Sequence, residues 1–298
     1  LDQNLFNPNS RGFAKLPVNG RSRYGNAATP FEGGYQIKSV KIISSTGGKS
    51  TETVVEPEIT DTRMRVDLPK LLKAGGDKVV VKVDYAYTVP EYGADRTGIL
   101  KNADGNIYAI AQWYPRICVF DDIQGWNTLP YLGASEFYLE YGNFDVSITA
   151  PASHVVVASG DLLNPSEVMT AEQLKRYQKA HKSDETVMIR SKEEIKDPSS
   201  RPSLAKLTWK YSIANSRDFA WASSTSFIWD AARINLPSGK KALAQSVYPS
   251  SSDGKNAWGR STEYTKASIE NYSKRWFEYP YPIATNVASN VGGMEYPG

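Results

Sequence analysis

The chain has 298 residues, of which 40% are hydrophobic and 22% are charged, so it is long enough for one large or two ordinary domains with real cores. Its formal charge of +3 is spread along the chain without a basic stripe, which argues against nucleic acid as a partner. No stretch approaches the roughly 20 apolar residues of a transmembrane helix, and the single cysteine, Cys118, excludes an internal disulfide framework.

The amino-terminal half has the pattern of β-strands. Residues 1–30 are polar and rich in Asn, Gly and Pro, which predicts a loop. From Tyr35 onward the hydrophobic period is two. The clearest strand lies in residues 78–89, "KVVVKVDYAYTV", where alternate residues share one face: Val79, Val81, Val83, Tyr85, Tyr87 and Val89.

Further strands are predicted in "NFDVSITAP", "HVVVAS", "ETVMIRS" and "KLTWKYSIA", the last with Leu207, Trp209, Tyr211 and Ile213 on one face. Turn-like Gly, Pro and Ser clusters separate these runs. Many strands with few helices between them favour an antiparallel, sandwich-like or saddle-like β fold over repeated βαβ units.

Two helices interrupt the strands. Thr170 and Gln173 form a capping-box signature that predicts a surface helix over 170–181. The second helix is predicted over 261–277, with an exposed pair between Glu270 and Lys274. Its apolar face is predicted to contain Thr265, Ile269, Tyr272 and Trp276. A change of composition near Ser250 predicts a boundary there, with a β-rich domain over 1–250 and a second domain over 251–298.

The usual catalytic signatures are absent from the sequence. The two histidines, His154 and His181, are in no zinc-binding pattern, and no complete set of zinc ligands can be assembled. Neighbouring acids at Asp121 and Asp122 raise the option of glycoside hydrolysis, although adjacent acids at a turn are usually solvated.

The last residues, "NVGGMEYPG", combine two glycines with a glutamate. Glycines let a backbone approach a ligand, and an edge strand after them would offer backbone groups to a peptide. A glutamate beside such an edge could pair with an ammonium group. On these residues alone, an ordinary turn with an exposed glutamate is the favoured explanation.

Together with other segments, this motif resembles the gluzincin zinc aminopeptidases of the aminopeptidase N type. "GGMEY" after a helix and "WFEYPYP" is similar to the exopeptidase motif of that family. "AIAQWYPRICVFDD" and "GNFDVSITAPASHVVVASGDL" resemble segments of its amino-terminal β domain, in the same order. The resemblance covers about Tyr35 to Gly298 and is closest to a bacterial branch, which makes a periplasmic or secreted location the favoured one.

The resemblance implies a mainly β amino-terminal domain followed by the start of an α/β, thermolysin-like catalytic domain. It implies that Glu295 binds the α-ammonium group of the substrate. It also implies that Gly292, Gly293 and Met294 form an edge strand that pairs with the substrate's backbone. Gln112 matches a glutamine that reaches the first specificity pocket. In the family, an HExxH motif and a later Glu hold the zinc, and these ligands are absent here. The chain is therefore expected to be a fragment that binds no zinc and has no activity alone.

Two departures from the family pattern limit what can be carried over. Tyr296 replaces the usual Asn of the motif, and Cys118 is displaced by one position, so we expect it only to pack. The main hypothesis is a zinc-dependent aminopeptidase in the full-length protein, acting on peptides with a free amino terminus. The alternative is a non-catalytic β module that binds peptide or glycan. The sequence does not indicate an oligomeric state.

Overall fold

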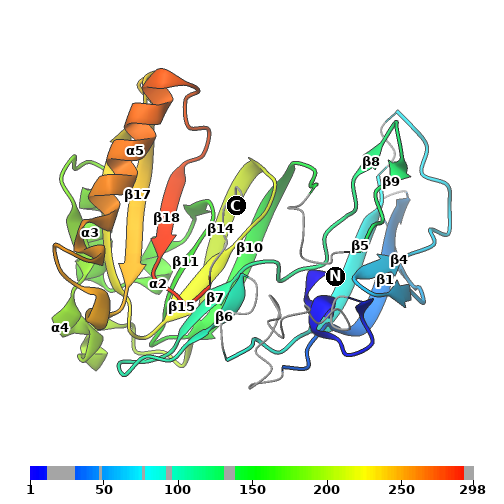
Figure 1. Cartoon of the computed structure of the whole chain (residues 1–298), viewed down its shortest axis with the longest axis horizontal. Helices are drawn as coiled ribbons and strands as arrows, with labels where there is room; N and C mark the ends of the chain where they lie inside the picture. The colour runs from blue at the N-terminus through cyan, green and yellow to red at the C-terminus, as the bar shows by residue number, and fades with distance from the viewer. Residues whose placement is uncertain (12–30, 47–48, 76–77, 92–95, 131–137, 292–298) are drawn as a thin grey trace, which may run out of the picture. The chain divides into compact units, whose positions relative to one another are not determined.

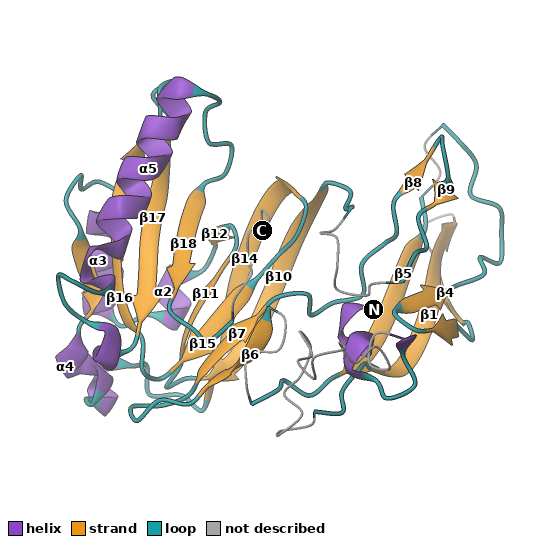
Figure 2. Cartoon of the chain, viewed as in Figure 1, coloured by secondary structure: helices purple, strands orange, loops and turns teal. Residues whose placement is uncertain are grey.

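The computed structural model describes residues 1–11, 31–46, 49–75, 78–91, 96–130 and 138–291 (Figure 1). It forms two compact units, one of Leu1–Pro90 with Gln112–Glu140 and one of Glu91–Ala111 with Tyr141–Gly298. Most of the regular structure is antiparallel sheet, which confirms the predicted mainly β fold (Figure 2). None of the helices in the described ranges has the length and apolarity needed to span a bilayer.

The first unit is built on a three-stranded antiparallel sheet of order β2-β1-β5. Its described residues also form two short hairpins, β3–β4 and β8–β9. Its elements are η1 Asp2–Phe6, β1 Gln36–Thr46, β2 Lys49–Val54, β3 Glu58–Thr60, β4 Arg63–Arg65, β5 Val80–Ala86, β8 Phe120–Asp121 and β9 Gly125–Trp126. The 3₁₀ helix η1 was not predicted, and four of its five residues are buried. The first residues are therefore not all loop.

The strand predicted over 78–89 is present as β5, and it pairs with β1 so that Val83 lies opposite Val40. Its predicted inner face is sheltered from Val83 onward, whereas Val81 is exposed. Tyr35 lies between the rings of Tyr85 and Tyr87, with centroid separations of 5.3 and 5.7 Å. These three aromatic side chains pack together at the end of the sheet where β1 begins and β5 ends.

The described residues of the second unit form three sheets. The first two have the orders β10-β14-β12 and β11-β15-β7-β6. Their strands are β6 Thr97–Leu100, β7 Ile107–Ile110, β10 Gly142–Pro151, β11 Val155–Ala158, β12 Asp161–Leu162, β14 Lys206–Ser216 and β15 Trp221–Ser224.

The alternation predicted in β14 is confirmed, because Leu207, Trp209, Tyr211 and Ile213 are all buried. The Tyr211 hydroxyl donates to the carbonyl of Val156 in β11 at 2.8 Å, which joins the two sheets. Gly160, between β11 and β12, has a φ of +83°, and a Cβ there would lie 2.3 Å from the carbonyl oxygen of Ser212. Only glycine fits this close approach of two strands.

The third sheet has the order β13-β16-β17-β18. Its strands are β13 Val187–Arg190, β16 Ile228–Asn235, β17 Lys241–Tyr248 and β18 Ile283–Val287, and the remaining helical elements are α2 Pro165–Val168, α3 Ala171–Ala180, α4 Lys192–Ile195, η2 Pro198–Ser200, η3 Ser250–Ser252, η4 Trp258–Arg260 and α5 Ser261–Arg275. β17 and β18 are parallel, and α5 connects them while lying along both strands (Figure 1). This connection gives the end of the chain the α/β character that the resemblance implies.

The predicted boundary near Ser250 falls between β17 and β18, which pair in one sheet. The α/β layer therefore includes strands that precede residue 250, and the division into residues 1–250 and 251–298 stays a prediction.

The helix predicted over 170–181 is present as α3. Thr170 Oγ1 accepts from the backbone N–H of Gln173 at 3.3 Å, which is one half of the predicted capping box. The Gln173 side chain instead donates to the carbonyl of Ser200 at 2.8 Å. Gln173, Tyr177 and Ala180 are buried, so α3 packs more deeply than its polar composition predicts.

The predicted apolar face of α5 is partly wrong. Ile269 packs against the core residues Ile234 and Ala244, but Tyr272 is 61% and Trp276 is 75% exposed. Small polar residues occupy the inner face instead, because the helix lies close to the sheet there: Thr262 and Ser273 are buried. Glu270 pairs with Lys266 at 2.5 Å and not with Lys274.

Candidate substrate-binding site

The strand β18 ends next to the sequence motif predicted to bind substrate. β18 is the last strand of its sheet and pairs only with β17 among the described strands. The ladder continues one residue further, where the backbone N–H of Ala288 donates to the carbonyl of Val247 at 3.0 Å. Asn290 Nδ2 then donates to the carbonyl of Ile99 in β6 at 3.2 Å. These contacts fix the chain directly before the motif.

The motif itself lies outside the described residues. Its members with predicted substrate roles are Gly292, Gly293, Met294 and Glu295. Their roles in pairing with the substrate backbone and in binding its ammonium group stay predictions.

Gln112 is the one predicted substrate-binding residue that the structure describes. Its side chain is 1% exposed, and among the described residues its Nε2 has no hydrogen-bond partner. Its backbone φ is +54°, in the left-handed region that costs a non-glycine residue about 1–2 kcal/mol. Its carbonyl accepts from Gln3 Nε2 and from the hydroxyl of Tyr35, each at 3.1 Å.

These two hydrogen bonds hold the strained backbone of Gln112 in place, while its side-chain amide nitrogen bonds to none of the described residues. Strained backbone and unpaired buried polar groups are both costly, and such features gather at functional sites. Gln112 belongs to the first unit and the motif follows the end of the described second unit.

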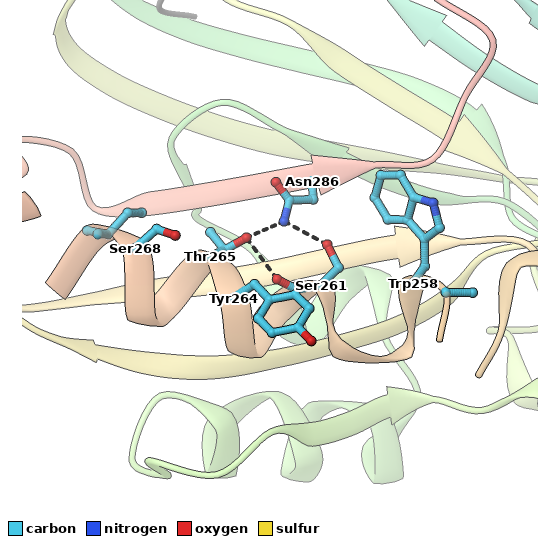
Figure 3. Close-up of a pocket in the computed structure, with 8 residues that line it drawn as sticks. Trp258, Ser261, Tyr264, Thr265, Ser268 and Asn286 are labelled. Atoms are coloured by element: carbon cyan, nitrogen blue, oxygen red, sulfur yellow. Dashed lines mark hydrogen bonds between the residues drawn. The ribbon is translucent and has the colours of Figure 1, made fainter. Parts of the chain in front are cut away.

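A hollow of about 640 Å³ lies beside α5 (Figure 3). Asn286 Nδ2 points into it from β18, donating to Ser261 Oγ at 2.9 Å and also to Thr265 Oγ1. Thr265 Oγ1 in turn donates to the carbonyl of Ser261 at 2.9 Å. Asn286, Ser261 and Thr265 thus bond to one another across the hollow, and this arrangement holds α5 against β18.

A buried acid lies on the sheet beneath the start of α5. Asp230 is 1% exposed, and its Oδ2 accepts from the Tyr248 hydroxyl at 2.7 Å. Its Oδ1 has no partner among the described residues. Burial raises the pKa of Asp230, and interactions with the hydroxyl groups of Thr262 and Tyr248 oppose part of that rise. Thr262 Oγ1 donates to Ser246 Oγ at 2.8 Å and completes the polar layer under the helix.

The histidines have structural surroundings. His154 Nδ1 lies 2.8 Å from Ser223 Oγ, and the ring of His181 packs edge-on against Tyr177. Within the described ranges, no three His, Cys, Asp or Glu side chains are placed to share a metal ion. The described residues therefore do not fit the zinc that the family resemblance implies.

One of the paired acids considered for glycoside hydrolysis, Asp121, also has a structural explanation. Asp121 accepts from the backbone N–H groups of Ile123 and Gln124 and from Asn127 Nδ2, at 2.7–3.0 Å. The hydrogen bond from Gln124 contributes most to lowering the pKa of Asp121. This carboxylate caps the turn between β8 and β9. Cys118 is exposed, so its expected packing role is wrong.

Sequence reasoning missed Asp230, Asn286 and a buried arginine, Arg190. Asp230 interrupts the apolar run of "FIWDAARI", and Arg190 ends "VMIR". A lone charge inside an otherwise buried strand is the signal that could have identified both, because such charges need a partner or a shifted pKa.

Comparison with known proteins gives matches among solved structures only. No protein-family model matches the chain, and no curated protein matches it. An M1 zinc metallopeptidase mutant from Deinococcus radiodurans, bound to a Tyr-Ser-Ala substrate, is 14% identical with a TM-score of 0.48. That match covers 88% of this chain and 48% of the other. The chain thus spans about half the length of that enzyme.

The second match is aminopeptidase A from Legionella pneumophila in complex with aspartic acid. It is 10% identical with a TM-score of 0.43, and the match covers 85% of this chain and 23% of the other. Both proteins are of the class that the sequence motifs resemble.

The raised pKa of Asp230 gives a pH-dependent prediction. Its carboxyl binds a proton more tightly in the folded state, so it stabilises the fold fully below its unfolded pKa of about 4. That contribution is lost as pH rises through the folded pKa. Asp230→Asn stays neutral at all pH values and keeps an acceptor for Tyr248. Its unfolding free energy should therefore increase relative to that of the wild type as pH rises. Urea unfolding at a series of pH values measures the difference.

Tyr248→Phe removes one of the hydrogen bonds that oppose the pKa rise, so the stabilising contribution of protonated Asp230 should persist to higher pH in this variant. Parallel pH profiles for the wild type and Asp230→Asn would contradict the assigned pKa shift.

Proposed function

We propose that this chain is the amino-terminal part of a zinc-dependent aminopeptidase. Its motif of Gly292, Gly293, Met294 and Glu295 would hold the amino-terminal end of a peptide substrate. The observation that carries the proposal is the order of elements before the motif: the helix α5, a proline-rich turn and the sheet-edge strand β18, with the motif following at once. This is the order that the family resemblance predicts.

The chemistry of the motif suits a peptide end. An edge strand leaves backbone N–H and C=O groups available, and an extended peptide can pair with them as an added strand. Two successive glycines remove the side chains that would keep such a peptide at a distance. A glutamate next to this strand would pair with the α-ammonium group, and that charge-assisted bond would restrict binding to unblocked peptides.

Gln112, a residue of the first unit, also supports the proposal. Its side chain is held by a strained backbone and carries a buried amide with no partner among the described residues. Such an amide can donate to a substrate carbonyl without first breaking an internal hydrogen bond. That property matches the role in the first specificity pocket implied by the resemblance.

The described residues supply no zinc site, so the metal ligands of the proposed enzyme would come from other residues. When bound, zinc lowers the pKa of a coordinated water to about 7 and polarises a carbonyl group. The contribution of the present chain is to bind and orient the substrate.

One surface favours the second candidate, a non-catalytic β module that binds peptide or glycan. Phe120 and Trp126, on the β8–β9 hairpin, are 61% and 57% exposed and pack edge to face at 5.2 Å. Exposed aromatic pairs can contact apolar or carbohydrate groups. Peptide or glycan binding that is lost in Trp126→Ala, without any hydrolysis by the complete gene product, would favour this second function.

Glu295→Gln tests the central contact in the protein encoded by the complete gene. Loss of the charged pair, worth about 1.5–3 kcal/mol, should lower kcat/KM on aminoacyl anilides by roughly tenfold to a hundredfold. Steady-state kinetics measure the change. Glu172→Gln, on the exposed side of α3, is the matched control and should leave kcat/KM unchanged. Equal kinetics for Glu295→Gln and the wild type would remove Glu295 from the site.

Gln112→Ala tests the specificity-pocket role separately from stability. Removing an unpartnered buried amide should leave the unfolding free energy within about 1 kcal/mol of the wild type. The same change should lower kcat/KM in the complete enzyme. Gln3→Ala is the control, because its buried amide donates to the carbonyl of Gln112 and its loss should destabilise the fold by about 1–3 kcal/mol. Unchanged kcat/KM in Gln112→Ala would show that its amide does not contact substrate.

A further inference from the structure

A second cavity, of about 780 Å³, lies in the second unit and contains two buried arginines. We call it the arginine cavity. Arg190, Arg201, Thr225, Ser153, Lys196 and Ser203 are the polar residues of its lining that matter below. It is formed where the chain after β13 passes through α4 and η2 and returns toward β14. It contains none of the residues proposed to bind the peptide substrate.

Arg190 has one side of its guanidinium group unused. It is 2% exposed, and Nη1 donates to the carbonyls of Thr225 at 2.8 Å and Phe227 at 3.1 Å. Nε is buried and has no partner among the described residues, and Nη2 donates to none of them. Nε and Nη2 form the side of a guanidinium that binds an oxyanion through two parallel hydrogen bonds. No described residue therefore accepts a hydrogen bond from this edge of Arg190.

Arg201 contributes a second buried positive charge whose donors go to neutral acceptors. Its Nη2 donates to the carbonyls of His154 and Val168, its Nη1 to Gln173 Oε1 and its Nε to the carbonyl of Ala152, each at 3.0 Å. Its guanidinium carbon lies 5.6 Å from the centroid of the Trp209 ring. These contacts fix Arg201 rigidly but leave its charge without a carboxylate.

The acids nearest the cavity are already engaged. Glu194 Oε2 accepts from Arg176 Nη1 at 2.8 Å and from the backbone N–H of Ser191 at 2.7 Å. Asp197, on the rim, accepts from the backbone N–H and the hydroxyl of Ser199. Neither acid forms an ion pair with Arg190 or Arg201 in the described part of the chain. Burial lowers the pKa of both arginines to about 10, the nearby charge of Glu194 opposes part of that change at Arg190, and Arg190 further lowers the pKa of Arg201.

Two buried guanidinium groups without a carboxylate partner are costly unless an anion neutralises them. We propose that the arginine cavity binds a tetrahedral oxyanion, such as a phosphate group, through the Nε–Nη2 edge of Arg190 and the ammonium group of Lys196. Ser153 and Ser203 supply hydroxyl groups at the rim. The cavity is larger than a bare phosphate, so the group can be free or carried by a small molecule. This site does not depend on the proposed peptidase function.

Calorimetric titration of the 298-residue chain with inorganic phosphate, in a phosphate-free buffer at pH 7 and constant ionic strength, tests the proposal. We expect saturable one-to-one binding, competition by sulfate and none by chloride at the same ionic strength. Glycerol phosphate separates the two sources: tighter binding than inorganic phosphate indicates a carried group, and weaker binding indicates the free ion.

Lys196→Ala should weaken phosphate binding on the order of fivefold, the size of one exposed ion pair. Lys192→Ala, on the same short helix but outside the lining, is the matched control and should bind as the wild type does. Arg190→Lys keeps the charge but loses the two-donor edge, so it should bind more weakly still, with its folding checked by circular dichroism. No saturable binding to the folded wild type would overturn the proposal, as would equal effects of the two lysine variants.

Discussion

The parallel pairing of β17 with β18 is the constraint on which the candidate substrate site depends. Five residue pairs, from Leu243 with Ile283 to Val247 with Val287, fix the register of the last described strand. Side chains reinforce that register on both faces of the sheet. Trp229 Nε1 donates to Gln245 Oε1 at 3.0 Å, and Gln245 Nε2 donates to Thr285 Oγ1 at 2.9 Å. On the α5 face, Asn286 is bound by the hydroxyls of the helix. A slip by one residue would exchange the two faces and break both sets of contacts.

Gln112, Arg190 and Asp230 are among the buried side chains of the described residues that have a hydrogen-bonding atom without a partner. Each lowers stability, since a buried donor or acceptor without a partner costs about 1–3 kcal/mol. Their surroundings differ. Asp230 can become neutral by binding a proton, Arg190 faces a cavity large enough for an anion, and Gln112 is held in a strained backbone. Proteins commonly retain such unfavourable features at the places where they bind another molecule.

Much of the fold could be predicted from the sequence, because strand burial in this protein follows period-two patterns. Trp209 and Tyr211 in β14 are buried as that pattern predicts, since β14 is covered on one face by another sheet. The pattern was misleading for α5, where Tyr272 and Trp276 are exposed and Thr262 is buried. Periodicity identifies apolar residues but not how closely a helix lies to its sheet, and a close approach selects small polar residues. The unused edge of Arg190 depends on carbonyl positions contributed from residues 225 and 227, which no local pattern specifies.

The residues that bind the peptide's amino terminus are the centre of this account, so the most direct measurement compares two substrates that differ only at that group. The protein encoded by the complete gene should hydrolyse an alanyl anilide and leave the N-acetylated alanyl anilide intact, because acetylation removes the ammonium group that Glu295 would bind. Comparable hydrolysis of both anilides, or hydrolysis of neither, would contradict the account.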